Sequence, residues 1–121
     1  MSYTHAAATN VESVMDDAYG GMWFLRDALA TDQLGVTILE LEPGARGKAH
    51  DHDDDGQEEV YVCVRGVVDV DFDGGADAEG GETVHLTENE AVRVSADQTR
   101  QLHNRGDERA KLVLVGTSNS A

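Results

Sequence analysis

Three side chains in the first half of the chain have the types and spacing of ligands for a divalent metal ion. His50 and His52 are separated by one residue, and Glu59 follows seven residues after His52. Alternate residues of an extended strand point to the same face, so the two imidazoles can converge on one ion. Two imidazoles and one carboxylate form a set that first-row divalent metals accept, with coordination positions left open. The pattern therefore predicts a metal site, and it does not select among Fe, Mn, Zn and Ni.

Glycines frame this stretch. Gly44 stands six residues before His50, and Gly66 stands seven residues after Glu59. The arrangement resembles the first motif of the cupin family, which has a glycine, five residues, His-x-His, a short gap, a glutamate, six residues and a closing glycine. Here the gap before the glutamate is two or three residues longer than the usual form, and the surplus forms an acidic turn at residues 53–57.

A second stretch, residues 89–104, resembles the second cupin motif. That motif has a glycine, an acid, an apolar strand, a proline, one residue, a glycine, two residues, a histidine, three residues and an asparagine. Asn104 matches the final asparagine. The glycine, the proline and the second glycine are replaced by Asn89, Ser95 and Asp97. The second motif is therefore degraded, although its register is kept.

Arg100 stands where the resemblance places a third histidine. An arginine is unfavourable beside a divalent cation because it cannot release its proton. Three alternatives follow: Arg100 pairs with Glu59 in a metal-free site, it binds an anionic ligand shared with the metal, or it is an outward surface residue. Tyr61 and His103 are further predicted pocket-lining donors, although His103 points to the opposite face from Arg100 in a regular strand.

The choice between Glu58 and Glu59 rests on two patterns that disagree. The strand that follows carries valine at alternate positions, Val60, Val62 and Val64. If the valines face the core, Glu58 points inward with them, whereas the count to the closing glycine selects Glu59. Both patterns hold if the valine face is also covered, by another sheet or a second subunit, because a strand buried on both sides need not alternate. We choose Glu59, which predicts a homodimer.

The remaining segments have the pattern of a small all-β protein. Short apolar strands recur every eight to twelve residues, and residues 67–73 alternate strictly between apolar residues and aspartates. We expect a strand from Met22 to near Leu29 and another at His50–His52. Together with the resemblance, the pattern implies a double-stranded β-helix, or jelly-roll cupin barrel, of roughly nine strands. One barrel domain is expected at residues 11–116, between flexible tails at 1–10 and 117–121.

Composition limits the partners and the location. Twenty-four acidic residues oppose nine basic ones, for a net charge of −15. Nucleic acid and membranes are not expected partners, because their anionic surfaces need a positive face. The acidity predicts a halophilic protein that loses its fold in low salt, with an ordinary acidic bacterial protein as the alternative. The single cysteine, Cys63, and the absence of a secretory signal or membrane-spanning stretch favour a cytoplasmic location.

The resemblance implies a function for the barrel interior. It predicts binding of a small anionic or polar ligand through a divalent metal ion on His50, His52 and Glu59, without a nucleotide cofactor. Two alternatives stay open, because one fold hosts many functions. One is a metal-free, non-catalytic module for ligand sensing or assembly. The other is a metal-dependent dioxygenase, isomerase or decarboxylase in which Arg100 orients the substrate.

Overall fold

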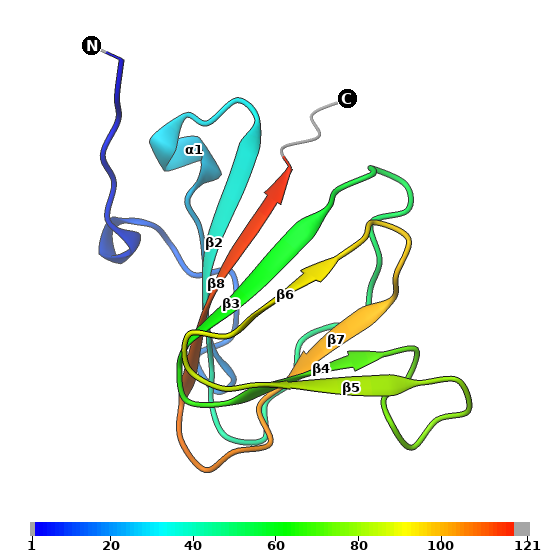
Figure 1. Cartoon of the computed structure of the whole chain (residues 1–121). Helices are drawn as coiled ribbons and strands as arrows, with labels where there is room; N and C mark the ends of the chain where they lie inside the picture. Colours follow the sequence, from blue (N-terminus) through cyan, green and yellow to red (C-terminus); the bar gives the residue numbers. More distant parts are fainter. Residues whose placement is uncertain (1, 118–121) are drawn as a thin grey trace.

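Antiparallel strands make up nearly all of the ordered elements in the computed structural model, which describes residues 2–117 (Figure 1). Two short helical turns, η1 (Ala8–Asn10) and α1 (Arg26–Leu29), accompany the strands. The strands are β1 (Gly20–Phe24), β2 (Leu34–Leu41), β3 (Glu59–Arg65), β4 (Val68–Phe72), β5 (Glu82–Leu86), β6 (Ala91–Val94), β7 (Arg100–His103) and β8 (Ala110–Thr117). The predicted all-β fold class is therefore confirmed.

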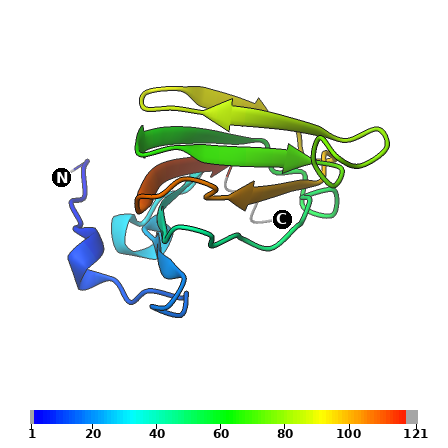
Figure 2. The same cartoon turned by 90° about the horizontal axis from the view of Figure 1, so that it is seen from below.

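Two sheets enclose the core. The larger has the order β1-β2-β8-β3-β6 and the smaller the order β5-β4-β7, and every pair of neighbours is antiparallel. In Figure 1 the sheets converge at the lower left and spread apart toward the upper right, so the barrel has a narrow end and a wide end. Figure 2 shows the N-terminal segment beside α1, away from β4 and β5. This is the predicted double-stranded β-helix.

The core is built from side chains that alternate along each strand. In β3, Tyr61 and Cys63 point inward and are at most 1% exposed. On β4, Val68 and Val70 are fully buried, and so is Leu112 of β8, which is paired with Cys63 of β3. Period-two alternation of apolar residues places one face of each sheet in the core. Because of this register, β3 presents Glu59 to the interior at the wide end.

Several local predictions need correction. The first predicted strand ends at Phe24 instead of near Leu29, because the chain turns into α1 and leaves it through Ala30 in a left-handed conformation (φ 55°). His50 forms only an isolated bridge, with Arg100, and not a strand. Residues 2–117 therefore contain eight strands instead of nine.

Ordered residues extend into both of the predicted tails. Of the predicted N-terminal tail, residues 8–10 form η1, and Thr4 Oγ1 donates a hydrogen bond to the carbonyl oxygen of Leu29. Thr117 is the last residue of β8, and residues 118–121 of the predicted C-terminal tail lie outside the described residues. Among residues 2–117, no helix has the length and hydrophobicity that a bilayer crossing requires.

Candidate metal centre

Three segments meet at the wide end of the barrel. Glu59 is the first residue of β3, where it is paired with Val94 of β6 and Gly116 of β8. The segment that carries the histidines is held against the opposite wall by backbone hydrogen bonds. His50 exchanges two of these bonds with Arg100, both 2.9 Å, and the amide of His52 donates to the carbonyl of Ala96 at 2.7 Å. These contacts turn both imidazoles toward β3.

The structure brings the three predicted ligands together. His52 Nε2 lies 3.2 Å from Glu59 Oε1, and His50 Nε2 lies 3.9 Å from the same oxygen. The two rings are perpendicular, with centroids 5.1 Å apart. One ligand atom from each residue lies within 4.8 Å of the others. The side chains of His50, His52 and Glu59 are 39%, 21% and 13% exposed, so the group is accessible from the cavity.

The contacts of the two Nδ1 atoms show where each ring carries its proton. His50 Nδ1 lies 2.9 Å from the carbonyl oxygen of Lys48, and His52 Nδ1 lies 3.1 Å from the carboxylate of Asp55. Both partners only accept hydrogen bonds, so each Nδ1 carries a proton. In the neutral rings the Nε2 lone pairs then point at Glu59. This outer shell is the usual one around histidine ligands of metals.

The Nε2 lone pairs and the Glu59 carboxylate repel one another unless a positive charge lies between them. Burial opposes ionisation of Glu59, but the neighbouring His50 and the hydrogen bond from Tyr61 hold the pKa of its carboxyl below its ordinary value, so it is an anion. A cation can be supplied by a metal ion on Nε2, or by protonation of the rings. The neighbouring Glu59 raises the pKa of His50, in the direction that protonation needs. The donor set fits a divalent metal.

Arg100 lies behind Glu59 and is fully buried. Its NH2 donates to Glu59 Oε1 at 3.2 Å, its Nε to the Tyr61 hydroxyl at 3.0 Å and its NH1 to the carbonyl of Gln98 at 2.7 Å. The alternative of an outward surface arginine is therefore excluded. The guanidinium is enclosed by these three partners and does not line the cavity, so the structure does not place it as a contact for a ligand.

Tyr61 completes this buried network. Its hydroxyl donates to Glu59 Oε1 at 2.7 Å while it accepts from Arg100. Burial, together with the neighbouring Glu59, raises the pKa of Tyr61 above its usual range, so the phenol keeps its proton as a donor. Tyr61 does line the cavity, as predicted for a pocket residue, but its polar atom is directed at Glu59. Arg100 and Tyr61 are therefore positioning residues for the carboxylate.

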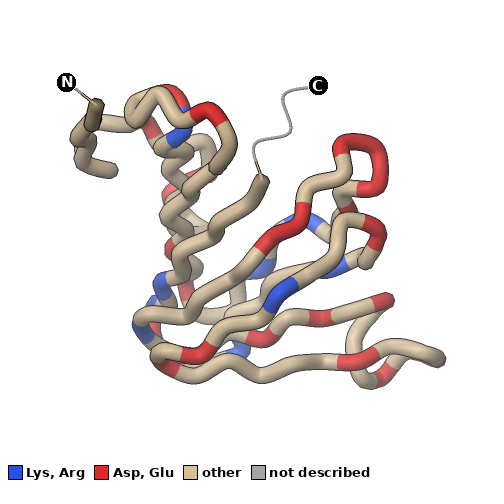
Figure 3. Tube along the Cα trace, turned by 45° about the horizontal axis from the view of Figure 1, so that its top comes forward, with Lys and Arg blue, Asp and Glu red and all other residues tan. Residues whose placement is uncertain are grey.

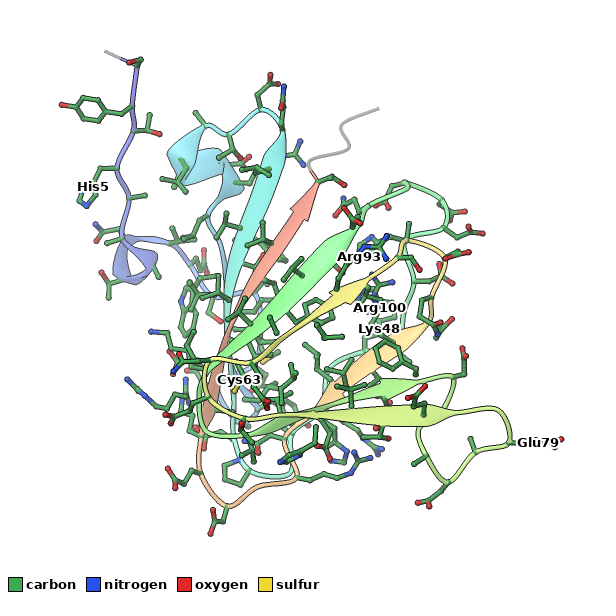
Figure 4. All side chains as sticks on the ribbon, in the orientation of Figure 1. His5, Lys48, Cys63, Glu79, Arg93 and Arg100 are labelled. Atoms are coloured by element: carbon green, nitrogen blue, oxygen red, sulfur yellow. The ribbon has the colours of Figure 1, made fainter. Side chains whose placement is uncertain are left out.

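The metal centre opens into a cavity of about 550 Å³. Figure 4 shows Lys48 and Arg100 at the wide end of the barrel and Cys63 at the narrow end. Besides the three candidate ligands and Tyr61, the cavity is lined by the polar or charged residues Arg26, Asp27, Thr37, Lys48, Gln57 and Thr117. Lys48 and Gln57 both lie within the first motif, but its spacing does not distinguish them as cavity residues. The cavity and the candidate metal ligands form one site.

Comparison with known proteins agrees with this geometry. The family model of the cupin domain matches residues 37–116, which is more than half of the chain. The chain belongs to the cupin family. No curated protein sequence matches this cupin.

Solved structures share the fold of this cupin at low sequence identity. A cupin protein from Bacteroides fragilis is 22% identical, with a TM-score of 0.74, over 100% of this chain and 89% of that chain. A sugar phosphate isomerase of the cupin superfamily from Silicibacter pomeroyi is 25% identical, with a TM-score of 0.70, over 93% of this chain and 74% of that chain. An oxalate decarboxylase from Bacillus subtilis, described with Mn(II) centres, is 15% identical, with a TM-score of 0.77, over 94% of this chain and 29% of that chain.

His103 does not join the site of this cupin, which corrects its assignment as a pocket residue. It is paired with Asp69 across β4 and β7, on the face of the smaller sheet opposite to Leu102. Arg105 binds Asp69 and Asp71 on this face at 3.0 and 2.9 Å. Burial and Arg105 lower the pKa of His103. The cause is strand alternation, which directs Arg100 and His103 to opposite faces of β7.

Proposed function

We propose that this cupin binds a small anionic or polar ligand through a divalent metal ion held by His50, His52 and Glu59. The observation that carries the proposal is the pair of Nε2 atoms that face one ionised carboxylate while both Nδ1 atoms donate elsewhere. The Mn(II) centres of the structurally similar oxalate decarboxylase are consistent with this assignment.

The site residues have distinct roles in this proposal. When bound, the metal supplies Lewis acidity, and three protein ligands leave positions for water and for the ligand. Arg100 and Tyr61 hold one oxygen of Glu59 through hydrogen bonds of 3.2 and 2.7 Å. The carboxylate is therefore oriented before any ion arrives, which reduces the ordering that metal binding requires.

Metal uptake tests the proposal directly. Protein stripped with a chelator and dialysed in high salt against Mn²⁺, Fe²⁺, Co²⁺, Ni²⁺ or Zn²⁺ is expected to take up one equivalent of at least one of these ions. The double variant His50→Ala/His52→Ala is expected to bind that ion at least 100-fold more weakly, because two of the three ligands are lost. Elemental analysis of the dialysed protein measures both results.

A matched control is available on the smaller sheet. His85 Nδ1 lies 2.5 Å from Asp69 Oδ1, so it is also a histidine that contacts a carboxylate, but without a second histidine. His85→Ala is expected to retain the full metal content. Absence of metal from both the wild type and the double variant would contradict the proposal and favour the metal-free binding module, with protonated imidazoles as the counter-cations of Glu59.

Catalysis is a second candidate function, favoured by the open coordination positions beside a cavity. Dioxygenation, isomerisation and decarboxylation all use a metal with free positions for substrate. Oxygen uptake, carbon dioxide release and isomer exchange can be followed on metal-loaded protein with a panel of small acids and sugar phosphates. Turnover that disappears in His50→Ala/His52→Ala supports an enzyme, whereas ligand binding without turnover supports a sensing module.

We further propose that the cupin is a homodimer through the outer face of its larger sheet. Partly exposed apolar side chains cover that face: Trp23, Ile38, Val60, Val62, Val113 and Val115. Figure 3 shows acidic residues concentrated in the loops and on other strands, while much of β8 carries neither charge. On a chain with a net charge of −15, a face poor in acids is where two copies can approach without strong repulsion.

A charge placed on this face is expected to separate the subunits. Val62→Lys would bury an unpaired ammonium in the interface, so we expect the mass in solution to fall from twice 13.0 kDa to 13.0 kDa. Light scattering after size exclusion measures the mass. His85→Lys adds the same charge on the smaller sheet and is expected to leave the dimer intact. A wild-type protein that is monomeric at micromolar concentration would contradict the proposal.

A further inference from the structure

Apolar side chains make up much of the cavity wall away from the metal centre, although Arg26, Asp27, Thr37 and Thr117 also line the cavity. Its apolar side chains come from four strands and the segment before β1: Met15, Met22, Phe24, Leu39, Leu102 and Leu114. The register places Phe24 opposite Thr37, which is paired in turn with Leu114, and puts Met22 opposite Leu39 one row deeper. A ligand that enters past Phe24 therefore meets methionine and leucine side chains below it.

Two glycines on the inner face of the larger sheet lie between the apolar wall and the metal centre and contribute no side chain to that part of the cavity. Gly35 lines the cavity and is paired with Gly116, which is paired with Glu59 on the far side. A Cβ at Gly35 would meet only the carbonyl oxygen of Gly116, at 3.9 Å, so the space above it is open. The body of a ligand can lie over Gly35 while one of its ends reaches the ligands of the metal.

Two cationic residues, Arg26 and Lys48, line the cavity, and Lys48 is the one next to the histidine segment. Lys48 lines the cavity, and its carbonyl oxygen accepts the hydrogen bond from His50 Nδ1, so it lies on the histidine side. No carboxylate within residues 2–117 forms an ion pair with Lys48. The chain contains 24 acids and only two lysines, so an unpaired lysine at a cavity is a charge that a bound anion can neutralise.

Resting on the proposed function, we infer that the ligand is a small carboxylic acid with an apolar body. Its carboxylate binds at the end where His50, His52 and Lys48 lie, and its aliphatic or aromatic body packs against the methionine and leucine wall. A sugar phosphate is a poorer fit, because much of its body would lie against methionine, leucine and phenylalanine side chains, which cannot satisfy its hydroxyl groups. The proposed ligand, a small anionic or polar molecule, is thereby narrowed to a monoanion with an apolar body.

Calorimetry with three probes tests this inference on wild-type protein, with and without the metal that dialysis identifies. The probes are 3-phenylpropanoate, the neutral 3-phenylpropanol and glucose 6-phosphate. We expect the acid to bind at least tenfold more tightly than either other probe, because only the acid has both an anionic end and an apolar body. Equal or tighter binding of the sugar phosphate or of the alcohol, or no measurable binding of the acid, would overturn the inference.

Two matched pairs of variants locate the acid in the cavity. Phe24→Gln is expected to weaken binding of 3-phenylpropanoate at least fivefold, whereas Leu34→Gln should not, since Leu34 is equally exposed but does not line the cavity. Lys48→Gln should weaken binding of 3-phenylpropanoate at least fivefold and leave binding of 3-phenylpropanol unchanged. Lys111→Gln, on the outer face, should change the affinity for neither probe. Equal effects within either pair would overturn the placement.

The same measurements separate this inference from the metal proposal. Metal content is determined for every protein before the titrations. Metal uptake without preference for the acid overturns the inference and leaves the metal site in place. Preference for the acid in a protein that takes up no metal overturns the metal proposal, and the cavity wall and Lys48 then account for recognition alone.

Discussion

Arg100→Met is expected to lower the free energy of unfolding of metal-free protein by about 3 kcal/mol. Removing one partner of a buried ion pair leaves the other charge uncompensated, which costs about 3–5 kcal/mol, and we take the lower end because the Glu59 side chain retains 13% exposure. Arg100 itself is fully buried, and its loss also leaves the Tyr61 hydroxyl and the Gln98 carbonyl without a donor. Methionine retains much of the volume, so the cavity cost is small.

The measurement is urea denaturation after treatment with a chelator, at one fixed high salt concentration. Arg93→Met is the matched control, since Arg93 pairs with Glu58 on the surface, with side chains 64% and 51% exposed. An exposed pair of this kind contributes about 0–1 kcal/mol. Equal losses in the two variants would show that the Arg100 network does not stabilise the fold. A smaller loss for Arg100→Met once metal is added is also expected, because the ion then compensates Glu59.

Much of the fold follows from local sequence patterns. The alternation of β3, β4 and β8 and the glycines around the first motif predict an all-β barrel, because a strand with one buried face has a period of two. The same argument places His103 on the opposite face from Arg100, and it outweighs the expectation that His103 lines the pocket. Strand periodicity does not reveal α1, since four residues are too few to show a helical period.

The partners of Arg100 could not be deduced from the sequence alone. The chain allows pairing with Glu59, contact with a ligand, or exposure, and the choice depends on how β7 lies against β3, 41 residues apart in the ion pair. The apolar cavity wall could not be predicted from the sequence for a similar reason. Met15 reaches it because Ser13 Oγ accepts a hydrogen bond from the amide of Met22 at 3.0 Å, which fixes the N-terminal segment beside β1. Such nonlocal contacts have no signature in residue spacing.

Arg100→His is expected to raise metal affinity by about 10²–10³-fold. Arg100 stands at the position where the cupin motif has its third histidine, and its NH2 lies 3.2 Å from the same Glu59 oxygen that His52 Nε2 approaches. Two effects act in one direction, and we expect them to exceed the loss of the hydrogen bond by which Arg100 orients Glu59. The substitution removes a fixed positive charge, whose repulsion of a dication a few ångströms away is worth a few kcal/mol at an effective dielectric constant near 20. It also adds an imidazole that can coordinate.

A second variant separates these two effects. Arg100→Gln removes the charge without adding an imidazole, so we expect its metal affinity to lie between those of the wild type and Arg100→His. Competition with a chromogenic chelator measures all three affinities, and each variant's stability is recorded because the buried network is lost in both. If Arg100→His binds metal no more tightly than Arg100→Gln, the imidazole does not reach the ion. If neither exceeds the wild type, Arg100 does not occupy the place of the missing ligand, and its charge is already neutralised by Glu59.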